Sequence, residues 1–279
     1  MKKNYILLFL SISFLFLSVK DSNFQISEMV LVEGGSFLQG SPYSDGFAEK
    51  DEQPQNKITV SSFYMSKYEV TVEEWKAYVK DKGIKMPATP KWGWDDSFPI
   101  SNITWDDAIE YCNWLSEKHG LEPAYKRRGS YPYCNFDATG YRMPTESEWE
   151  FAARGGNKSK GFFYVGSNTP DRMSWHQENS DARPHTVGTK YANELGIYDL
   201  NGNVWEWCWD IYDEQYYNDI KKELTSAENP KGATDGEYRV VKGGSWDSKI
   251  SFLRPANKVR TKPSQVYDFF GLRLVRTAK

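Results

Sequence analysis

The fold of this chain is decided by residues 201–209, which read NGNVWEWCW. The tryptophans Trp205, Trp207 and Trp209 alternate with other residues, so in an extended strand they share one face. A face of three large rings most simply packs into a core. After residue 155, Gly, Asn, Asp and Pro recur throughout and helical periodicity fades, which predicts loops around short strands. The other strands expected there are 238–242 and 271–275.

The first half of the chain carries more regular structure. Three expected helices begin with a threonine followed three residues later by an acid, and these two side chains satisfy the free amides of a first helical turn reciprocally. In the second of these helices the apolar residues recur at helical spacing and predict one buried face. The threonine–acid pairs are Thr71 with Glu74, Thr104 with Asp107 and Thr145 with Glu148. The buried face of the second helix comprises Trp105, Ala108, Ile109, Cys112 and Leu115. Strands are expected at 29–32 and between 58 and 70.

Composition places the chain among globular proteins. Its 279 residues are 39% hydrophobic and 26% charged, which excludes intrinsic disorder and a polytopic membrane protein. With a net charge of -3, the chain lacks the basic surface that nucleic-acid binding requires. The aromatic share of 16%, with 11 Trp, favours a loop-rich fold over a coiled coil or helical bundle. Because neither a composition break nor a repeat divides residues 28–279, we predict one α+β domain there.

Residues 1–20 have the pattern of an export signal. Two lysines precede a short apolar run from Ile6 to Leu17, which is too brief for a comfortable membrane span. The run is not followed by a clean small-x-small cleavage site, so the segment is either a signal peptide or a retained N-terminal anchor. Residues 21–27 form a polar linker. We expect an exported protein that is periplasmic, envelope-associated or secreted.

The three cysteines and three histidines match no metal-binding spacing. Cys112, Cys134 and Cys208 are too few to form a disulfide framework in a chain of this length. Two alternatives are open: three buried thiols, which we favour, or one disulfide with a spare thiol.

Six segments form a recognisable set: 29–40 (MVLVEGGSFLQG), 68–71 (YEVT), 140–150 (GYRMPTESEWE), 201–207 (NGNVWEW), 243–246 (GGSW) and 270–273 (FGLR). Their order and spacing resemble the sulfatase-modifying-factor family, whose type member is the formylglycine-generating enzyme. The resemblance covers essentially all of the chain after residue 28. It implies a single loop-rich α+β domain, the formylglycine-generating-enzyme-like variant of the C-type lectin fold.

The resemblance also implies that one activity is absent. Family members that oxidise a cysteine of sulfatases to formylglycine bind copper through two cysteines, three and eight positions after the serine of the Gly-Gly-Ser motif. Counting from Ser245, the matching positions are Ser248 and Leu253. A hydroxyl and an isobutyl group cannot replace soft thiolate ligands. We therefore expect neither bound copper nor the cysteine-oxidising activity.

The loop at 199–206 resembles a calcium-binding loop of the family. The matching ligands are the side chains of Asp199 and Glu206 and the backbone carbonyls of Gly202 and Val204. Ca²⁺ takes six to eight oxygen ligands, so this donor set suits a structural calcium ion. The alternative is a plain turn, in which Asp199 accepts local amides and Glu206 pairs with an arginine.

The family's cleft implies a ligand-binding surface after the Gly-Gly-Ser motif. The matching stretch, 246–254, and its continuation to residue 260 mix a ring, hydroxyls and guanidinium groups, which suit a polar or acidic ligand with one apolar part. Trp205 and Trp246 either border the cleft or pack in the core. The loop after Trp246 either binds a ligand or is a solvated surface. The candidate ligand-binding residues are Trp205, Ser245, Trp246, Ser248, Arg254 and Arg260.

Three functions fit these features. The first is an exported, non-catalytic binding or accessory module of the cell envelope, whose partner is a protein, a peptide or a small polar ligand and not a nucleic acid. The second is an oxidoreductase-type enzyme of the same family that uses a different chemistry in the same cleft. The third is a structural envelope component attached to the membrane through the N-terminal segment. The missing cysteines favour the first.

Overall fold

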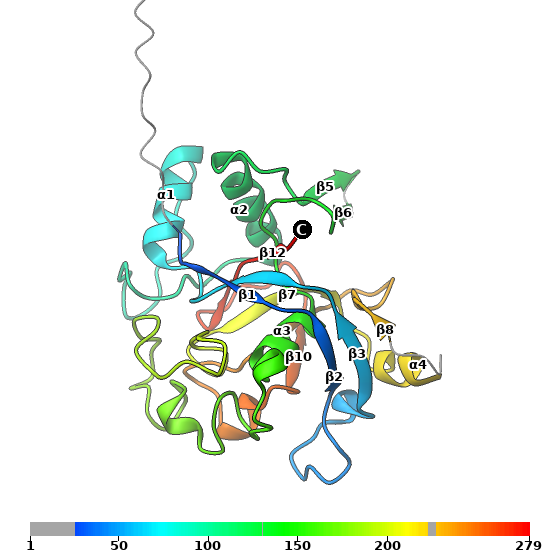
Figure 1. Cartoon of the computed structure of the whole chain (residues 1–279). Helices are drawn as coiled ribbons and strands as arrows, with labels where there is room; N and C mark the ends of the chain where they lie inside the picture. The colour runs from blue at the N-terminus through cyan, green and yellow to red at the C-terminus, as the bar shows by residue number, and fades with distance from the viewer. Residues whose placement is uncertain (1–25, 130, 223–226) are drawn as a thin grey trace, which may run out of the picture.

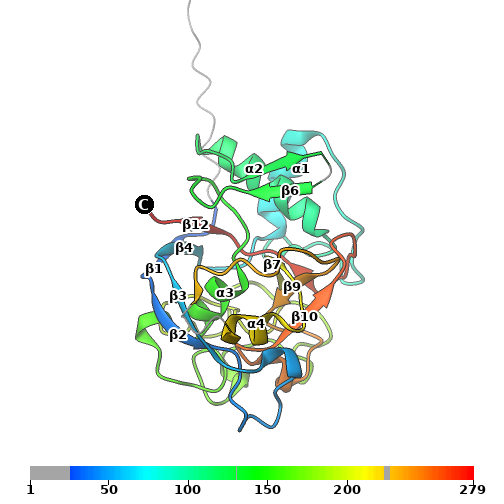
Figure 2. The ribbon, with the colours of Figure 1, turned by 90° about the vertical axis from the view of Figure 1, so that its right-hand side faces the viewer.

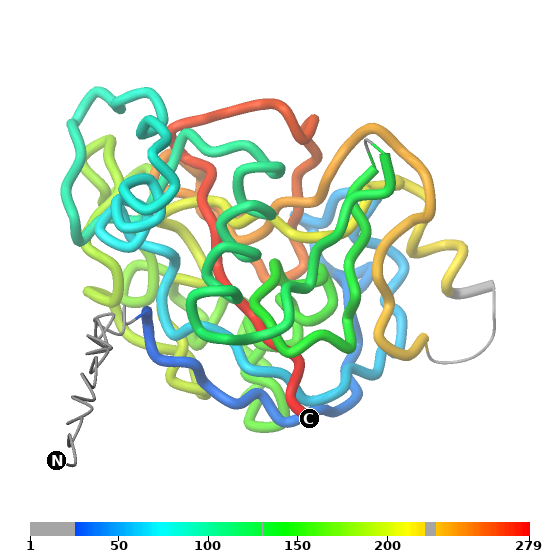
Figure 3. The backbone as a smooth tube through the Cα atoms, turned by 90° about the horizontal axis from the view of Figure 1, so that it is seen from above, coloured from blue at the N-terminus to red at the C-terminus, as the bar shows by residue number. Residues whose placement is uncertain are grey.

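The strands form several small sheets. The structure, a computed structural model, describes residues 26–129, 131–222 and 227–279, so the predicted signal or anchor and most of the linker lie outside the described residues. One sheet has the order β1 (Met29–Val32), β4 (Phe63–Ser66), β12 (Val275–Thr277), and another β2 (Gly35–Gln39), β3 (Asn56–Val60), β8 (Ala227–Glu228). β12 thus returns the C-terminal segment to the N-terminal strands, and this segment (red) runs through the middle of the molecule in Figure 3.

The central sheet contains the tryptophan-rich strand. β7 (Trp205–Ile211) lies between β9 (Arg239–Lys242) and β11 (Phe270–Gly271), and β10 (Lys258–Thr261) pairs with the far side of β9. Trp207 is fully buried, which confirms the core role of this strand. The single strand predicted at 271–275 is wrong, because Gly271 ends β11 while Val275 begins β12 in a different sheet. Residues 272–274 cross from one sheet to the other.

Helices α1 (Val72–Lys82), α2 (Trp105–Lys118) and α3 (Glu146–Ala153) begin where they are predicted, and each has a complete capping box. α1 and α2 pack together at the upper end of Figure 1, next to the hairpin of β5 (Tyr125–Arg128) and β6 (Tyr131–Cys134). Trp75 of α1 stacks on Tyr111 of α2 with ring centroids 4.9 Å apart. Helix α4 (Tyr216–Lys222) is not expected from the sequence, because helical periodicity fades after residue 155.

The buried side chains form two clusters. The first joins α1 and α2 to Trp205 and Trp207 of the central sheet. The second packs Trp149 and Phe151 of α3 against β1, β3 and β4. Loops gather at the end opposite α1 and α2, as Figures 1 and 2 show. Within the described residues, no helix is both long enough and apolar enough to cross a membrane.

Candidate functional site

Of the two positions that match the family's cysteines, Ser248 lies in a turn and Leu253 packs in the core. Ser248 Oγ accepts the backbone N–H of Ser245 at 2.9 Å, and the two hydroxyl oxygens lie 3.2 Å apart in a buried turn. Leu253 ends the 3₁₀ helix η4 (Ile250–Leu253) and is fully buried. It lies so close to Gly244 that a Cβ there would meet Leu253 Cδ2 at 2.6 Å. Ser245 and Ser248 therefore satisfy each other rather than pointing into a cleft.

The two candidate tryptophans are mostly buried. Trp205 is 5% exposed and belongs to the first core cluster. Trp246 is 9% exposed, and its ring packs edge-on against Trp92 with centroids 5.2 Å apart. Its backbone N–H donates to Asn203 O at 2.8 Å, which joins the Gly-Gly-Ser motif to the 201–209 segment. Burial favours core packing for Trp205 and leaves only one edge of Trp246 at the surface.

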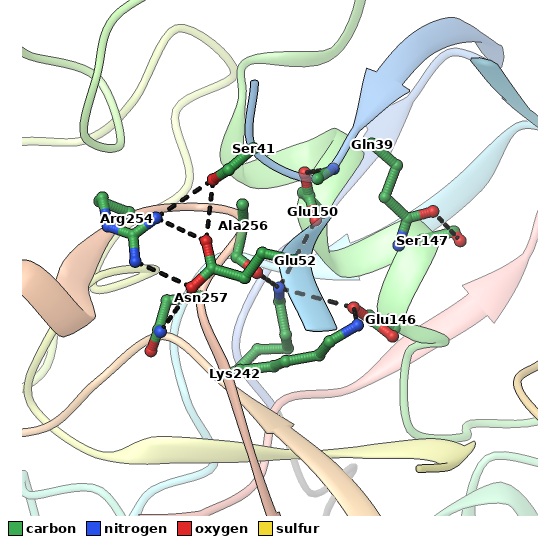
Figure 4. Close-up of polar contacts among 12 residues, drawn as sticks. Gln39, Ser41, Glu52, Glu146, Ser147, Glu150, Lys242, Arg254, Ala256 and Asn257 are labelled. Atoms are coloured by element: carbon green, nitrogen blue, oxygen red, sulfur yellow. Dashed lines mark hydrogen bonds and ion pairs between the residues drawn. The ribbon is translucent and has the colours of Figure 1, made fainter. Parts of the chain in front are cut away.

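Arg254 lies in a buried ionic network, which Figure 4 shows. Its guanidinium donates to Glu52 Oε1 at 2.8 Å and to Asp45 Oδ2 at 2.9 Å, and Asn257 Nδ2 donates to Glu52 Oε1 at 2.9 Å. Burial opposes ionisation of Glu52, but the hydrogen bonds from Arg254 and Asn257 outweigh it and hold the pKa of Glu52 below its ordinary value. Arg254 is 2% exposed, so its guanidinium braces loops and offers little surface to a ligand.

Two buried lysines extend the charged interior, and Figure 4 draws Lys242 among them. Lys242 Nζ donates to Ala256 O at 3.1 Å and lies 3.5 Å from Glu150 Oε2. Lys258 Nζ lies 2.9 Å from Glu146 Oε1. Burial opposes ionisation of Glu146, but these two lysines lower its pKa below the ordinary value. Each charge has a partner, so the arrangement holds α3 against β9 and β10.

Arg260 is a candidate guanidinium that is exposed and lines an open groove. The groove has a volume of about 470 Å³ and runs between η1 (Lys50–Glu52) and β10, beside Phe252. Arg260 is exposed, and its guanidinium carbon lies 5.2 Å from the ring centroid of Tyr212. Tyr212 in turn donates its hydroxyl to Asp51 Oδ2 at 2.8 Å. The groove thus combines aromatic rings with three basic and three acidic side chains, and Phe252 in its wall directly precedes Leu253.

The predicted calcium loop is buried and only partly satisfied by the protein. Glu206 accepts Arg273 Nε at 2.8 Å and Trp149 Nε1 at 2.7 Å, which matches the arginine pairing of the alternative interpretation. Asp199 accepts the Gly188 N–H at 2.6 Å through one oxygen. Its other oxygen, Oδ1, is buried without a hydrogen-bond partner among the described residues.

A third carboxylate, Glu69, lies at the same loop. It accepts Asn203 Nδ2 at 2.8 Å and the Val204 N–H at 3.2 Å. Burial, then the negative charge of Asp199, raises the pKa of Glu69, and burial also raises that of Asp199. The positive charge of Arg273 opposes these effects at both carboxyl groups, and that of Lys190 opposes them at Asp199.

The fit of calcium to this loop rests on the unpartnered Asp199 Oδ1. No group of three or more His, Cys, Asp or Glu side chains within the described residues is arranged to hold a metal. The family's ligand set needs only two such side chains, with two backbone carbonyls. Of these side chains, Asp199 has one carboxylate oxygen without a partner among the described residues, while Glu206 would share its oxygens with Arg273.

The three cysteines are free, buried thiols, which confirms the favoured alternative. Burial raises the pKa of Cys134 to about 12, and it raises those of Cys112 and Cys208 as well. A thiol with so high a pKa is protonated at neutral pH and is a poor nucleophile and metal ligand.

Comparison with known proteins gives one consistent family. A model of the sulfatase-modifying factor enzyme 1-like domain matches residues 16–278. A relative named chaperone protein LppX, from Paenibacillus barcinonensis, is 34% identical over 283 residues, which covers 90% of this chain and 89% of the relative. The structure is similar to Treponema denticola variable protein 1 (26% identity, TM-score 0.75, 89% and 94% of the two chains). It is also similar to PvdO from Pseudomonas aeruginosa (26%, TM-score 0.73, 90% and 95%). The chain belongs to the sulfatase-modifying factor enzyme 1-like family.

Proposed function

We propose that this chain is a non-catalytic binding or accessory module built on the formylglycine-generating-enzyme scaffold. The observation that carries the proposal is the fate of the two cysteine positions. Ser248 is closed into a turn with Ser245, and Leu253 is fully buried. The remaining thiols are buried and have raised pKa values, so they supply no substitute pair. The scaffold is kept while the groups that bind copper are replaced.

The groove beside Arg260 is the proposed binding surface. Arg260 offers a guanidinium that is exposed and braced between the rings of Tyr212 and Tyr238. Phe252 lines the same groove and adds an apolar wall. A polar or acidic group on a protein, peptide or small molecule, next to an apolar part, matches this mixture. Ser245, Trp246, Ser248 and Arg254 are not among the described residues that line this groove.

We further propose an extracytoplasmic location and a structural calcium ion. The location rests on the lysine-and-apolar pattern of residues 1–20. The calcium ion rests on the resemblance of residues 199–206 to the family's loop and on the unpartnered oxygen of Asp199. A bound Ca²⁺ would satisfy that oxygen and fix the turn at Gly202 and Val204, which leads into the central strand β7.

The full-length protein is expected not to convert the cysteine of a sulfatase-type Cys-x-Pro-x-Arg peptide to formylglycine, with or without added copper. The reason is the absence of both thiolate ligands at Ser248 and Leu253. Mass spectrometry of the peptide measures the outcome, with an active formylglycine-generating enzyme as positive control. Turnover comparable to that control would overturn the proposal of a non-catalytic module.

Capture of the partner from envelope extracts is expected to depend on Arg260. Arg260→Ala should weaken binding by about 1–3 kcal/mol, the scale of an arginine anchor at an interface. Arg128→Ala is a matched control, because Arg128 is also exposed and lies 5.0 Å from a tyrosine ring centroid, on the hairpin beside α2. Equal losses in the two variants, or none in Arg260→Ala, would place the binding surface elsewhere.

A further inference from the structure

A second cleft shares no lining residue with the groove that holds Arg260. It has a volume of about 280 Å³ and lies between the loop 41–45, the loop 161–168 and residues 254–256. The first of these loops follows β2 and projects from the end of the molecule opposite α1 and α2 (Figure 1). We call it the loop-end cleft.

An exposed aromatic side chain lies on one wall of the loop-end cleft. Phe163 lines it and is 40% exposed. Phe162 lines it as well, and the exposed Tyr43 (76%) follows the lining residue Pro42 in the loop of the opposite wall. A ring that stays in water beside a cleft contributes little to the core, so this wall points to a ligand with an apolar face.

The backbone that carries these rings is held rigidly. Phe163 N–H donates to Asn168 Oδ1 at 2.9 Å, and Tyr164 N–H donates to Ser167 O at 3.0 Å, which closes a tight hairpin. In the other wall, Asp45 Oδ1 accepts the Phe47 N–H at 2.9 Å. Asp45 is itself fixed by the buried Arg254 described above. The backbone on both sides of the cleft is therefore fixed, which lowers the backbone entropy lost on binding.

The polar groups of the loop-end cleft are uncharged or already neutralised. Arg254 is paired with Glu52 and Asp45, and Arg154 Nη2 lies 2.8 Å from Glu150 Oε1. Two carboxamides supply the remaining hydrogen-bonding capacity. Asn168 uses its Oδ1 to accept the Phe163 N–H, and Gln55 uses its Nε2 to donate to Gly40 O. Within the described residues, the amide N–H groups of Asn168 and the carbonyl oxygen of Gln55 are left for a ligand.

We propose that the loop-end cleft binds a neutral glycan. A sugar ring presents an apolar C–H face that stacks on an aromatic ring, and its rim of hydroxyl and acetamido groups both donates and accepts hydrogen bonds. Exposed rings on rigid turns, carboxamides with free donors and acceptors, and paired charges match all of these features. An acidic glycan would find no unpaired cation among the described lining residues of this cleft. The site is separate from the Arg260 groove, so neither proposal depends on the other.

The test is titration of the full-length protein with the neutral tetrasaccharide of N-acetylglucosamine, measured by isothermal titration calorimetry. Saturable binding is expected, and Phe163→Ala should weaken it at least fivefold, with a further loss in Phe163→Ala/Tyr43→Ala. Tyr131→Ala is the matched control, because Tyr131 is 79% exposed on β6 beside α2, at the other end of the molecule. Its affinity should equal that of wild type, and melting temperatures of all variants should agree.

Three results would overturn the proposal. The first is no heat of binding at millimolar tetrasaccharide; the second is equal affinity in wild type and the Phe163→Ala/Tyr43→Ala variant. The third is preferential binding of a sulfated or uronic-acid oligosaccharide, because that would require an unpaired cation. None of these results bears on capture through Arg260, so a failure here is distinguishable from a failure of the proposed function.

Discussion

Replacing Arg254 with alanine is expected to reduce the free energy of unfolding by about 3–5 kcal/mol at pH 7, because removing one member of a buried ion pair strands the other. Glu52 and Asp45 both lose their cationic partner and keep only neutral hydrogen-bond donors, and the side chain of Glu52 is fully buried. Urea denaturation of wild type and variant measures the loss.

The same substitution should have a smaller effect in acid. In wild type the folded-state pKa of Glu52 is depressed, so its contribution is complete above the ordinary value of 4.5 and is lost as pH falls through the lower folded-state value. In Arg254→Ala the stranded carboxylate is protonated more readily. The difference in stability between the two proteins should therefore shrink as the pH is lowered from 7 towards 4.

Arg260→Ala is the matched control for Arg254→Ala. Arg260 is exposed and lies in the neighbouring strand β10, so its removal should change the free energy of unfolding by less than about 1 kcal/mol, as for an ordinary surface substitution. A loss in Arg254→Ala no larger than this, or one that does not vary with pH, would contradict the buried network.

The sequence does not predict that Arg254 is buried and Arg260 is exposed. Both belong to one short segment, and nothing in their neighbours distinguishes a buried brace from an exposed ligand contact. The difference comes from Glu52, which lies 202 residues before Arg254 in the chain. A charged stretch around Glu52 is visible in the sequence, but its partner is set by tertiary packing alone. The same holds for Glu69 at the calcium loop, 134 residues from Asn203.

Local rules predicted the fold better than the site. The three capping boxes and the strand with alternating tryptophans follow from spacing within a few residues, and both are present. The helix α4 and the division of 270–277 between two sheets depend on which neighbours each segment meets, which spacing does not encode. The sequence shows the Gly-Gly-Ser motif, but the hydrogen bonds between Ser245 and Ser248 that close the turn depend on the folded backbone.

Removal of Ca²⁺ from the loop at 199–206 should lower the melting temperature of the full-length protein. A ligand that binds only the native state adds RT ln(1 + [L]/Kd), about 2.7 kcal/mol at a hundredfold excess over Kd. Asp199 Oδ1, buried and without a protein partner among the described residues, is the oxygen that would gain most from the ion. Differential scanning calorimetry with calcium and with chelator measures the shift.

Asp199→Asn should abolish that dependence without removing the turn. The amide oxygen of asparagine can still accept the Gly188 N–H, and asparagine tolerates the left-handed backbone of this position, where φ is 57°. What it lacks is the charge that attracts the cation. Asp235→Ala, at an exposed acid away from the loop, should keep the full calcium response. If chelator leaves the melting temperature of calcium-loaded wild type unchanged, Arg273 alone balances Glu206, and the loop is a turn braced by that ion pair.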